Sequence, residues 1–200
     1  MSIQHKFTEI ELIVGCQKYN KQIQQEVYEK YSPVLRAVCA RYARDYSETE
    51  DILQEGFIKI FTNVKSFTYQ GKDSYIKWMK RVMVNAAITY YNKHTRKRKE
   101  YSIEDTPIDD DKNDKLLSNE EGDNIYNASV LSKEDILNIL QSVPEDFRLV
   151  FNLYVIEGYE HKEIAKMLNI KTETSRTRLL RAKKLIKQEI IKIDSSFEKQ

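Results

Sequence analysis

The sequence predicts an all-α protein with two small helical domains, an N-terminal helical bundle and a C-terminal helix-turn-helix domain, joined by an acidic, flexible linker. Five glycines and three prolines in 200 residues are too few for the frequent turns of a β-sandwich and favour long helices. Hydrophobic residues make up 40% of the chain and recur at helical spacing. The charge distribution then sets the expected boundaries: domains at 1–99 and 131–200, and a linker at 100–130.

The distribution of charge is more informative than the formal net charge of +2. Residues 76–99 hold eight Lys or Arg and no acid, and residues 171–192 hold eight basic residues against two acids. Between these blocks, residues 100–123 hold ten acids against two lysines. Two basic blocks flanking an acidic segment predict two polyanion-binding surfaces joined by a tether that does not bind DNA.

The first half of the chain is predicted to form three or four helices. One covers residues 9–31, with a polar middle that leaves its continuity open, and Pro33 suits the first turn of the next helix. The capping-box pattern Ser47-Glu48-Thr49-Glu50 is expected to start a helix that ends near residue 64. After a loop, the last helix of this half is expected at residues 74–96.

The second half contains four further predicted helices. Ser132 resembles an N-cap, Pro144 suits a first turn and Gly158 suits a helix end. These signals place the helices at residues 132–143, 144–158, 160–168 and 172–190.

The last two of these helices have the features of a helix-turn-helix. The first helix of this motif needs a small residue so that the second can cross it closely, and Ala165 fits that position. Asn169 tolerates the left-handed conformation that the turn requires, and Ile170 can pack the turn against the core. Thr172 can cap the second helix.

The second helix of the motif carries the candidates for reading duplex DNA. Arginine can donate two hydrogen bonds to guanine, threonine and leucine suit phosphate or a thymine methyl, and lysines hold phosphates. A solvated basic helix in an ordinary bundle is the alternative, but the turn, the small residue and the cap together favour DNA binding. The candidates are Lys171, Thr174, Arg176, Thr177, Arg178, Leu180, Arg181 and Lys184, with Lys183 as a further phosphate contact.

In the first half, a basic helix with interleaved aromatic residues is the candidate for holding unpaired bases. Basic side chains supply an electrostatic groove and aromatic rings supply stacking surfaces, which together suit single-stranded nucleic acid. For Trp78, a place in the hydrophobic core is an equally open alternative. The candidates, with two aromatic residues from the preceding loop, are Phe67, Tyr69, Lys77, Trp78, Lys80, Arg81, Asn85, Lys93 and Arg96.

The order of these pieces resembles an extracytoplasmic-function (ECF) RNA polymerase sigma factor from about residue 28 to 189, outside the linker. Residues 50–61 resemble the family's polymerase-binding helix, residues 75–87 its promoter-melting segment, and residues 157–182 its −35-reading helix-turn-helix. There are departures from the family pattern. Ser175 stands where a buried valine is usual, and Glu173 and Asn169 each replace a common glycine.

The resemblance implies a mechanism and partners. Asp51, Gln54 and Glu55, which by composition alone are an ordinary wetted helix face, would bind the β′ clamp helices of core RNA polymerase. The N-terminal domain would open the −10 element and trap a flipped base in the loop before Ser74, and the C-terminal domain would bind the −35 element. The implied partners are core polymerase, including its β subunit, promoter DNA and an anti-sigma factor that clamps both domains.

Two other functions stay open as alternatives. A helix-turn-helix regulator with an N-terminal dimerisation or sensing domain would bind its operator without polymerase, whereas a sigma factor would bind DNA weakly until polymerase is present. An enzyme acting on nucleic acid is disfavoured, because the three histidines have no metal-site spacing and no glycine-rich phosphate loop occurs. We therefore expect no catalytic residue, no metal site and no cofactor.

The expected location is the cytoplasm, without membrane insertion. Cys16 and Cys39 lie in apolar helical patterns, which does not suggest a disulfide framework. The first residues lack the apolar run of a signal peptide, and no stretch approaches the roughly 18 apolar residues of a membrane span.

Overall fold

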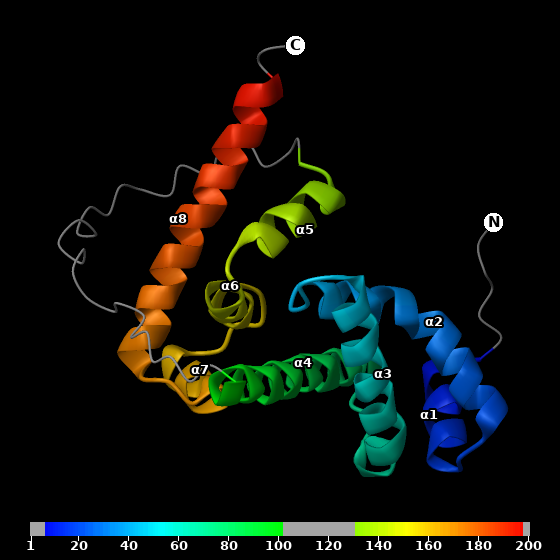
Figure 1. The fold of residues 1–200 in the computed structure, drawn as a ribbon. Helices are drawn as coiled ribbons and strands as arrows, with labels where there is room; N and C mark the ends of the chain where they lie inside the picture. Colours follow the sequence, from blue (N-terminus) through cyan, green and yellow to red (C-terminus); the bar gives the residue numbers. More distant parts are fainter. Residues whose placement is uncertain (1–6, 102–130, 198–200) are drawn as a thin grey trace.

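The computed structural model describes residues 7–101 and 131–197, and all regular structure in these two ranges is helical (Figure 1). The all-α prediction is confirmed. Residues 100 and 101, expected in the linker, belong to a helix, and the rest of the predicted linker, residues 102–130, lies outside the described residues. The N-terminal half comprises α1 (Glu9–Gln17), α2 (Lys21–Ala40), α3 (Tyr46–Asn63), the 3-10 helix η1 (Val64–Ser66) and α4 (Ser74–Tyr101). The C-terminal half comprises α5 (Lys133–Ser142), α6 (Glu145–Phe151), the π-helical segment η4 (Asn152–Ile156), α7 (His161–Leu168) and α8 (Thr172–Phe197).

The first helix break falls in the polar stretch where the sequence left the continuity of the helix open. Tyr19 has a left-handed backbone (φ 56°) that ends α1, and the Asn20 side chain accepts hydrogen bonds from the N–H groups of Gln22 and Ile23 at 3.0 and 3.2 Å. A new helix starts there because a capping asparagine satisfies the free N–H groups of its first turn. Pro33 lies inside α2 with its ring at the surface, so its expected place at a helix start was wrong.

Helix α3 is capped two residues before the predicted position. Asp45 is the N-cap and accepts from the N–H of Glu48 at 2.9 Å, while the Glu48 carboxylate accepts from the N–H of Arg44 at 2.9 Å. Glu50, expected in the capping box, forms an ion pair with Arg36 at 2.6 Å instead. Aspartate takes the capping position because its carboxylate also suits the positive end of the helix.

The N-terminal helices pack closely around a buried methionine. Gly56 of α3 faces Met83 of α4, and a Cβ at Gly56 would lie 2.1 Å from the Met83 sulfur. Met83 is fully buried, and its sulfur lies 3.8 Å from the sulfur of Cys39 in α2. The three helices therefore approach one another at a point where a larger residue on α3 would force the Met83 side chain to move.

The helix-turn-helix of the C-terminal half forms as predicted. Ala165 is buried where α7 and α8 cross, and Ile164 and Leu168 of α7 are buried with it. Asn169 adopts the left-handed conformation (φ 54°, ψ 49°) that ends α7, and Ile170 packs against the core. Thr172 is the first residue of α8 itself, one position later than a capping residue would lie.

The two halves pack against each other, a relation that the sequence left open (Figure 1). Buried hydrophobic residues of both halves belong to one continuous cluster. Three backbone carbonyls at the end of α2 accept hydrogen bonds from C-terminal side chains, and such carbonyls lack partners within their own helix. These bonds run from Gln141 to Ala40 (3.4 Å), from Asn152 to Arg41 (2.7 Å) and from Arg148 to Tyr42 (3.3 Å).

None of the helices in the described ranges combines the length and the apolar character needed to cross a bilayer. Over the same ranges, no cluster of three or more histidine, cysteine or acidic side chains is arranged to hold a metal ion.

Candidate nucleic-acid interface

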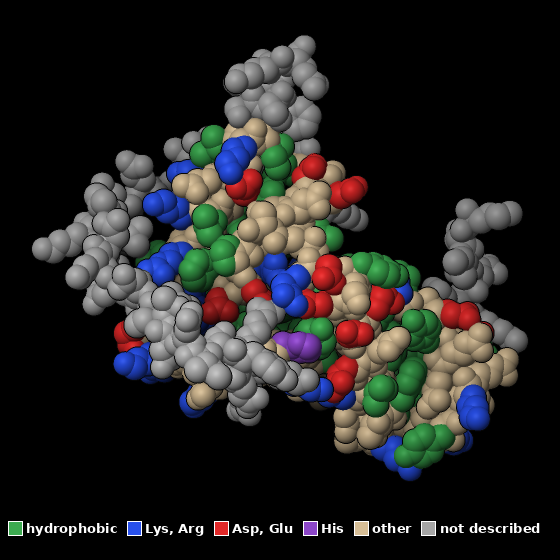
Figure 2. Space-filling view, viewed as in Figure 1, with side chains coloured by type: hydrophobic (Ala, Val, Ile, Leu, Met, Phe, Trp, Pro, Cys, Tyr) green, Lys and Arg blue, Asp and Glu red, His purple; other side chains and the backbone are tan. Residues whose placement is uncertain are grey.

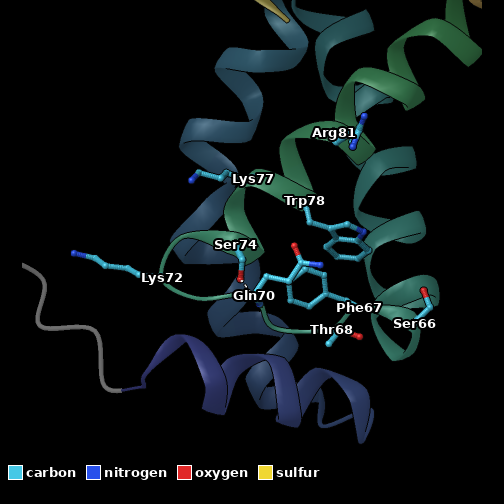
Figure 3. Close-up of a pocket in the computed structure, with 9 residues that line it drawn as sticks. All are labelled: Ser66, Phe67, Thr68, Gln70, Lys72, Ser74, Lys77, Trp78 and Arg81. Carbon is cyan, nitrogen blue, oxygen red and sulfur yellow. Dashed lines mark hydrogen bonds between the residues drawn. The ribbon is translucent and has the colours of Figure 1, made fainter. Parts of the chain in front are cut away.

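A pocket of about 520 Å³ opens where the loop after η1 meets the start of α4 (Figure 3). The loop contributes short polar and aromatic side chains, and the first two turns of α4 contribute cations and an indole. Its lining residues are Ser66, Phe67, Thr68, Gln70, Lys72, Ser74, Lys77, Trp78 and Arg81. The pocket therefore combines ring faces with three positive charges, which suits a nucleobase with its attached phosphate.

Trp78 is half-buried between the hydrophobic core and the pocket, and its predicted contact with DNA stays a prediction. Its indole stacks on the fully buried ring of Tyr75, with centroids 5.8 Å apart and an interplanar angle of 11°. It also lies 5.1 Å from the Phe67 ring at the pocket, and the two rings lie together in Figure 3. Trp78 thus joins the hydrophobic core to the pocket wall, and the core fixes the orientation of the indole.

The other candidates of this half follow the exposed side of α4. Lys77, Arg81 and Asn85 lie at four-residue intervals and are exposed, so they form one stripe that leads away from the pocket. Lys80 and Lys93 are exposed beside it, whereas the side chain of Arg96 lies outside the described residues. Tyr69 is exposed but is not among the residues that line the pocket.

A second exposed surface, the α3 face, is formed by Asp51, Gln54, Glu55 and Ile58. These residues are spaced three and four apart, and acidic side chains gather over the upper part of α3 in Figure 2. Ile58 is 66% exposed, which is unusual for an isoleucine inside a well-packed bundle. Ile58 was not among the residues predicted from the sequence, although its position seven residues after Asp51 places it on the same side of the helix.

The exposed part of the recognition helix is narrower than the sequence suggested. Arg176, Leu180 and Lys184 lie at four-residue intervals on α8 and are exposed; we call them the α8 stripe. Lys171 and Lys183 are exposed near it, while Thr174 and Thr177 are half-buried. Figure 2 shows basic side chains along α8.

Two of the predicted DNA contacts, Arg178 and Arg181, pack against another helix of the C-terminal half. Arg178 pairs with Asp146 of α6 at 2.6 Å and is only 18% exposed, and the Tyr91 hydroxyl of α4 donates to the same carboxylate. The Arg181 guanidinium lies over the Phe147 ring, 5.9 Å from its centroid. Both arginines join α8 to α6, and among the predicted contacts on this helix the α8 stripe is more exposed than they are.

Ser175, which stands where the resembled family usually has a buried valine, has a polar partner in the structure. Ser175 is fully buried, and its hydroxyl lies 3.0 Å from Nδ1 of His161, the first residue of α7. The Tyr154 ring stacks on the imidazole, with centroids 4.4 Å apart. Burial and the nearby charge of Arg176 lower the pKa of His161, so the neutral imidazole is favoured as the partner of the hydroxyl.

Two stretches of the chain match sequence models of one family and together cover more than half of it. The sigma-70 region 2 model matches residues 27–97, and the sigma-70 region 4 model matches residues 133–186. The ECF RNA polymerase sigma-E factor of Haemophilus influenzae is 24% identical over 188 residues, which covers 92% of this chain and 96% of that protein. The chain belongs to the ECF sigma factors.

Two further sigma factors are similar to this chain over most of its length. The ECF RNA polymerase sigma-E factor of Escherichia coli (strain K12) is also 24% identical over 188 residues, covering 92% of this chain and 95% of that protein. The sigma factor RpoE of Bartonella quintana, solved in complex with the anti-sigma factor NepR, is 16% identical; the match covers 83% of this chain and 95% of that one, with a TM-score of 0.46.

The pocket and the α3 face of this sigma factor both lie within its region 2 match, and the α8 stripe lies within its region 4 match. Helix α1 lies outside both matches.

Proposed function

We propose that this sigma factor directs core RNA polymerase to promoters by holding an unpaired base of the −10 element in the pocket and by reading the −35 element with the α8 stripe. The observation that carries the proposal is the pocket itself, where two aromatic rings in tilted contact and three cations meet within the region 2 match. A surface for intact duplex needs no such recess, whereas an unpaired base gains from stacking on a ring.

The −10 contact follows from the order of side chains along α4. A base entering the pocket would meet Phe67 and Trp78, and its strand would then follow the stripe Lys77, Arg81 and Asn85. Exposed cations at these positions hold phosphates, so the strand is kept separated from its complement.

The −35 contact uses the α8 stripe. Arg176 is near the start of the recognition helix, where side chains of a helix-turn-helix reach base edges. Leu180 can contact a thymine methyl, and Lys184 a phosphate. Arg178 and Arg181 hold α8 against α6 through their contacts with Asp146 and Phe147.

The α3 face is the proposed site for the β′ clamp helices of core polymerase. It combines two carboxylates and an amide with the exposed Ile58, so it can offer both charge and an apolar contact. An anti-sigma factor that holds both halves is the further partner we propose, because each half carries one of the surfaces that the proposed function needs.

The test is run-off transcription with purified core polymerase, with and without this protein, on promoters selected from a random duplex library. We expect transcripts only when both proteins are present. Asp51→Ala combined with Gln54→Ala should reduce polymerase binding several-fold without changing the affinity for naked DNA. Tight, specific operator binding by the protein alone, with no transcript, would instead favour a helix-turn-helix regulator.

A further inference from the structure

The pocket depends on a segment that has no regular structure of its own. Residues 67–73 connect η1 to α4 and provide Phe67, Thr68, Gln70 and Lys72 to the pocket wall. Within this loop, the N–H of Gln70 donates to the Ser74 hydroxyl at 3.2 Å (Figure 3). Because a loop has few internal bonds to fix its path, its shape must be set by its neighbours.

Helix α1 binds both ends of this loop through backbone groups. At the first end, the Gln17 side-chain amide donates to the carbonyls of Val64 and Phe67, each at 3.2 Å. At the second end, the Glu9 carboxylate accepts from the N–H groups of Asp73 at 3.0 Å and Tyr75 at 2.8 Å. Bonds to the main chain fix the course of the loop whatever side chains it carries.

The chemistry of each bond suits its place. The N–H groups at the start of α4 have no partner within their helix, and a carboxylate at that end also faces the positive pole of the helix dipole. Glu9 meets both requirements from a different helix. Gln17 offers an amide that can donate to two carbonyls where the 3-10 helix ends.

The two residues lie at opposite ends of one short, well-anchored helix. Eight residues separate Glu9 from Gln17, which corresponds to about 12 Å along a helix axis. Leu12, Ile13 and Cys16 of α1 are buried in the core, so the helix is a fixed support. In Figure 3 this helix, in dark blue, runs beneath the loop.

We infer that α1 acts as a loop clamp, in which Glu9 and Gln17 are positioning residues that hold the pocket in the shape needed to capture a base. Neither residue lines the pocket, and both precede the region 2 match. The inference rests on the proposed capture of an unpaired base. It adds that selectivity for the captured base depends on a helix outside the matched region.

The test compares Glu9→Gln and Gln17→Leu with two matched controls. Glu11→Gln makes the same change two residues away on α1, where the carboxylate serves only the N-cap at Thr8. Gln22→Leu makes the same replacement as Gln17→Leu, but at an exposed position of α2. Each variant is assembled with core polymerase and bound to fork-junction DNA carrying the selected promoter, with an abasic site placed at each unpaired −10 position in turn.

The measured quantity is the ratio of affinities for intact and abasic DNA within each variant. If a variant is partly unfolded, both apparent affinities fall by the same factor, so the ratio does not change. For the unaltered protein we expect a loss of about tenfold at one position, as stacking of one base predicts. Glu9→Gln and Gln17→Leu should reduce that loss to about threefold or less, and both controls should retain it.

Each other outcome has a distinct meaning. If the unaltered protein shows no loss at any position, base capture itself is wrong. If it shows the loss and the two clamp variants show the same loss, the loop clamp is wrong while base capture stands. If the controls lose discrimination as well, the effect belongs to the helices in general and the four hydrogen bonds are not its cause.

Discussion

At the scale of single residues, the pair formed by His161 and Ser175 shows how a polar side chain is accommodated inside a helix-turn-helix. A buried hydroxyl without a partner costs free energy, and the imidazole supplies that partner at 3.0 Å. Since the bond joins the first turn of α7 to the second turn of α8, it also fixes the angle between the two helices of the motif.

The pair predicts a specific pattern of stabilities. His161→Leu leaves the Ser175 hydroxyl buried without its partner, so the free energy of unfolding should fall by about 1–3 kcal/mol. Adding Ser175→Val should recover most of that loss, because removing both polar groups together is nearly neutral. Urea denaturation of the single and double variants measures both effects. A double variant no more stable than His161→Leu alone would show that the hydroxyl is not the cause.

The same histidine predicts a dependence of stability on pH. Burial and the charge of Arg176 lower the pKa of His161 in the folded protein, so the unfolded chain binds more protons as the pH falls below about 6.5, the ordinary value for histidine. The contribution of His161 is therefore fully present above that pH and is lost as the pH falls from there through the lower pKa of the folded protein. The urea midpoint should fall less between pH 7.5 and 5.5 in His161→Leu than in the unaltered protein, and equal falls would contradict this.

Two arginines on α8 should respond in opposite ways to replacement by alanine. Arg176→Ala removes an exposed donor, so −35 selection by the holoenzyme should weaken by about 1–3 kcal/mol without a change in melting temperature. Arg178→Ala breaks the ion pair with Asp146, so it should lower the melting temperature. Fluorescence anisotropy with −35 DNA and thermal unfolding separate the two. Loss of DNA affinity in Arg178→Ala at full stability would place that side chain at the groove.

The sequence predicted which helix would carry the basic side chains but not which of them would be exposed. The sequence predicted Arg176, Leu180 and Lys184 only as members of a larger set of candidates, and these three lie exposed on one side of α8. It could not reveal that Asp146 and Phe147, some 30 positions earlier, would pack against Arg178 and Arg181. Charge alone does not distinguish an arginine that binds DNA from one that pairs within the fold.

At the scale of helices, the closest approach in the N-terminal half depends on Gly56. Gly56→Ala would place a methyl group 2.1 Å from the Met83 sulfur, and Met83 is enclosed by the core. We expect a loss of about 1–3 kcal/mol from overpacking, which exceeds the gain of about 1 kcal/mol in helix propensity. Thermal unfolding measures the net effect.

A second variant separates the contact from other causes. Met83→Val removes the sulfur and the terminal methyl, so Gly56→Ala should cost far less in that background than in the unaltered protein. An equal cost in both backgrounds would mean that the strain lies elsewhere on α3.

Helix boundaries show where local sequence signals suffice and where they compete. The predicted cap at Ser132 and the left-handed Asn169 are confirmed, because at each place one residue supplies the required backbone or side-chain geometry. At the start of α3, Asp45 and Ser47 could both cap, and the choice depended on Glu50 finding Arg36 in α2. A contact between helices decided a boundary that local pattern left ambiguous.

At the scale of the whole molecule, the end of α2 is the place where the two halves meet. Arg148 is 2% exposed, and it donates to carbonyls of both halves, at Gln141 (3.1 Å) and at Tyr42 (3.3 Å). Glu157 pairs with Arg41 at 2.9 Å, and α7 is tied to α4 by a bond from Asn92 to the Met167 carbonyl. If the pocket and the α8 stripe are to reach separate promoter elements, these contacts must break.

The interface can be weakened by removing side chains that bond across it. Asn152→Ala with Glu157→Ala removes bonds to Arg41 and Tyr42 that run only between the halves. At about 1 kcal/mol for each of the two side chains, the ratio of closed to open molecules should fall roughly thirtyfold. Small-angle X-ray scattering should then show a larger radius of gyration for the double variant.

The matched control changes the same residue types at exposed positions of α5, as Glu134→Ala with Asn138→Ala. It should leave the radius of gyration unchanged. Holoenzyme assembled with the double variant Asn152→Ala, Glu157→Ala should also bind promoter DNA at least as well as holoenzyme with the unaltered protein. In the variant, the interface between the halves no longer has to break first. A double variant that stays closed would show that the shared hydrophobic cluster holds the halves together without these polar contacts, and promoter binding would then require core polymerase to separate them.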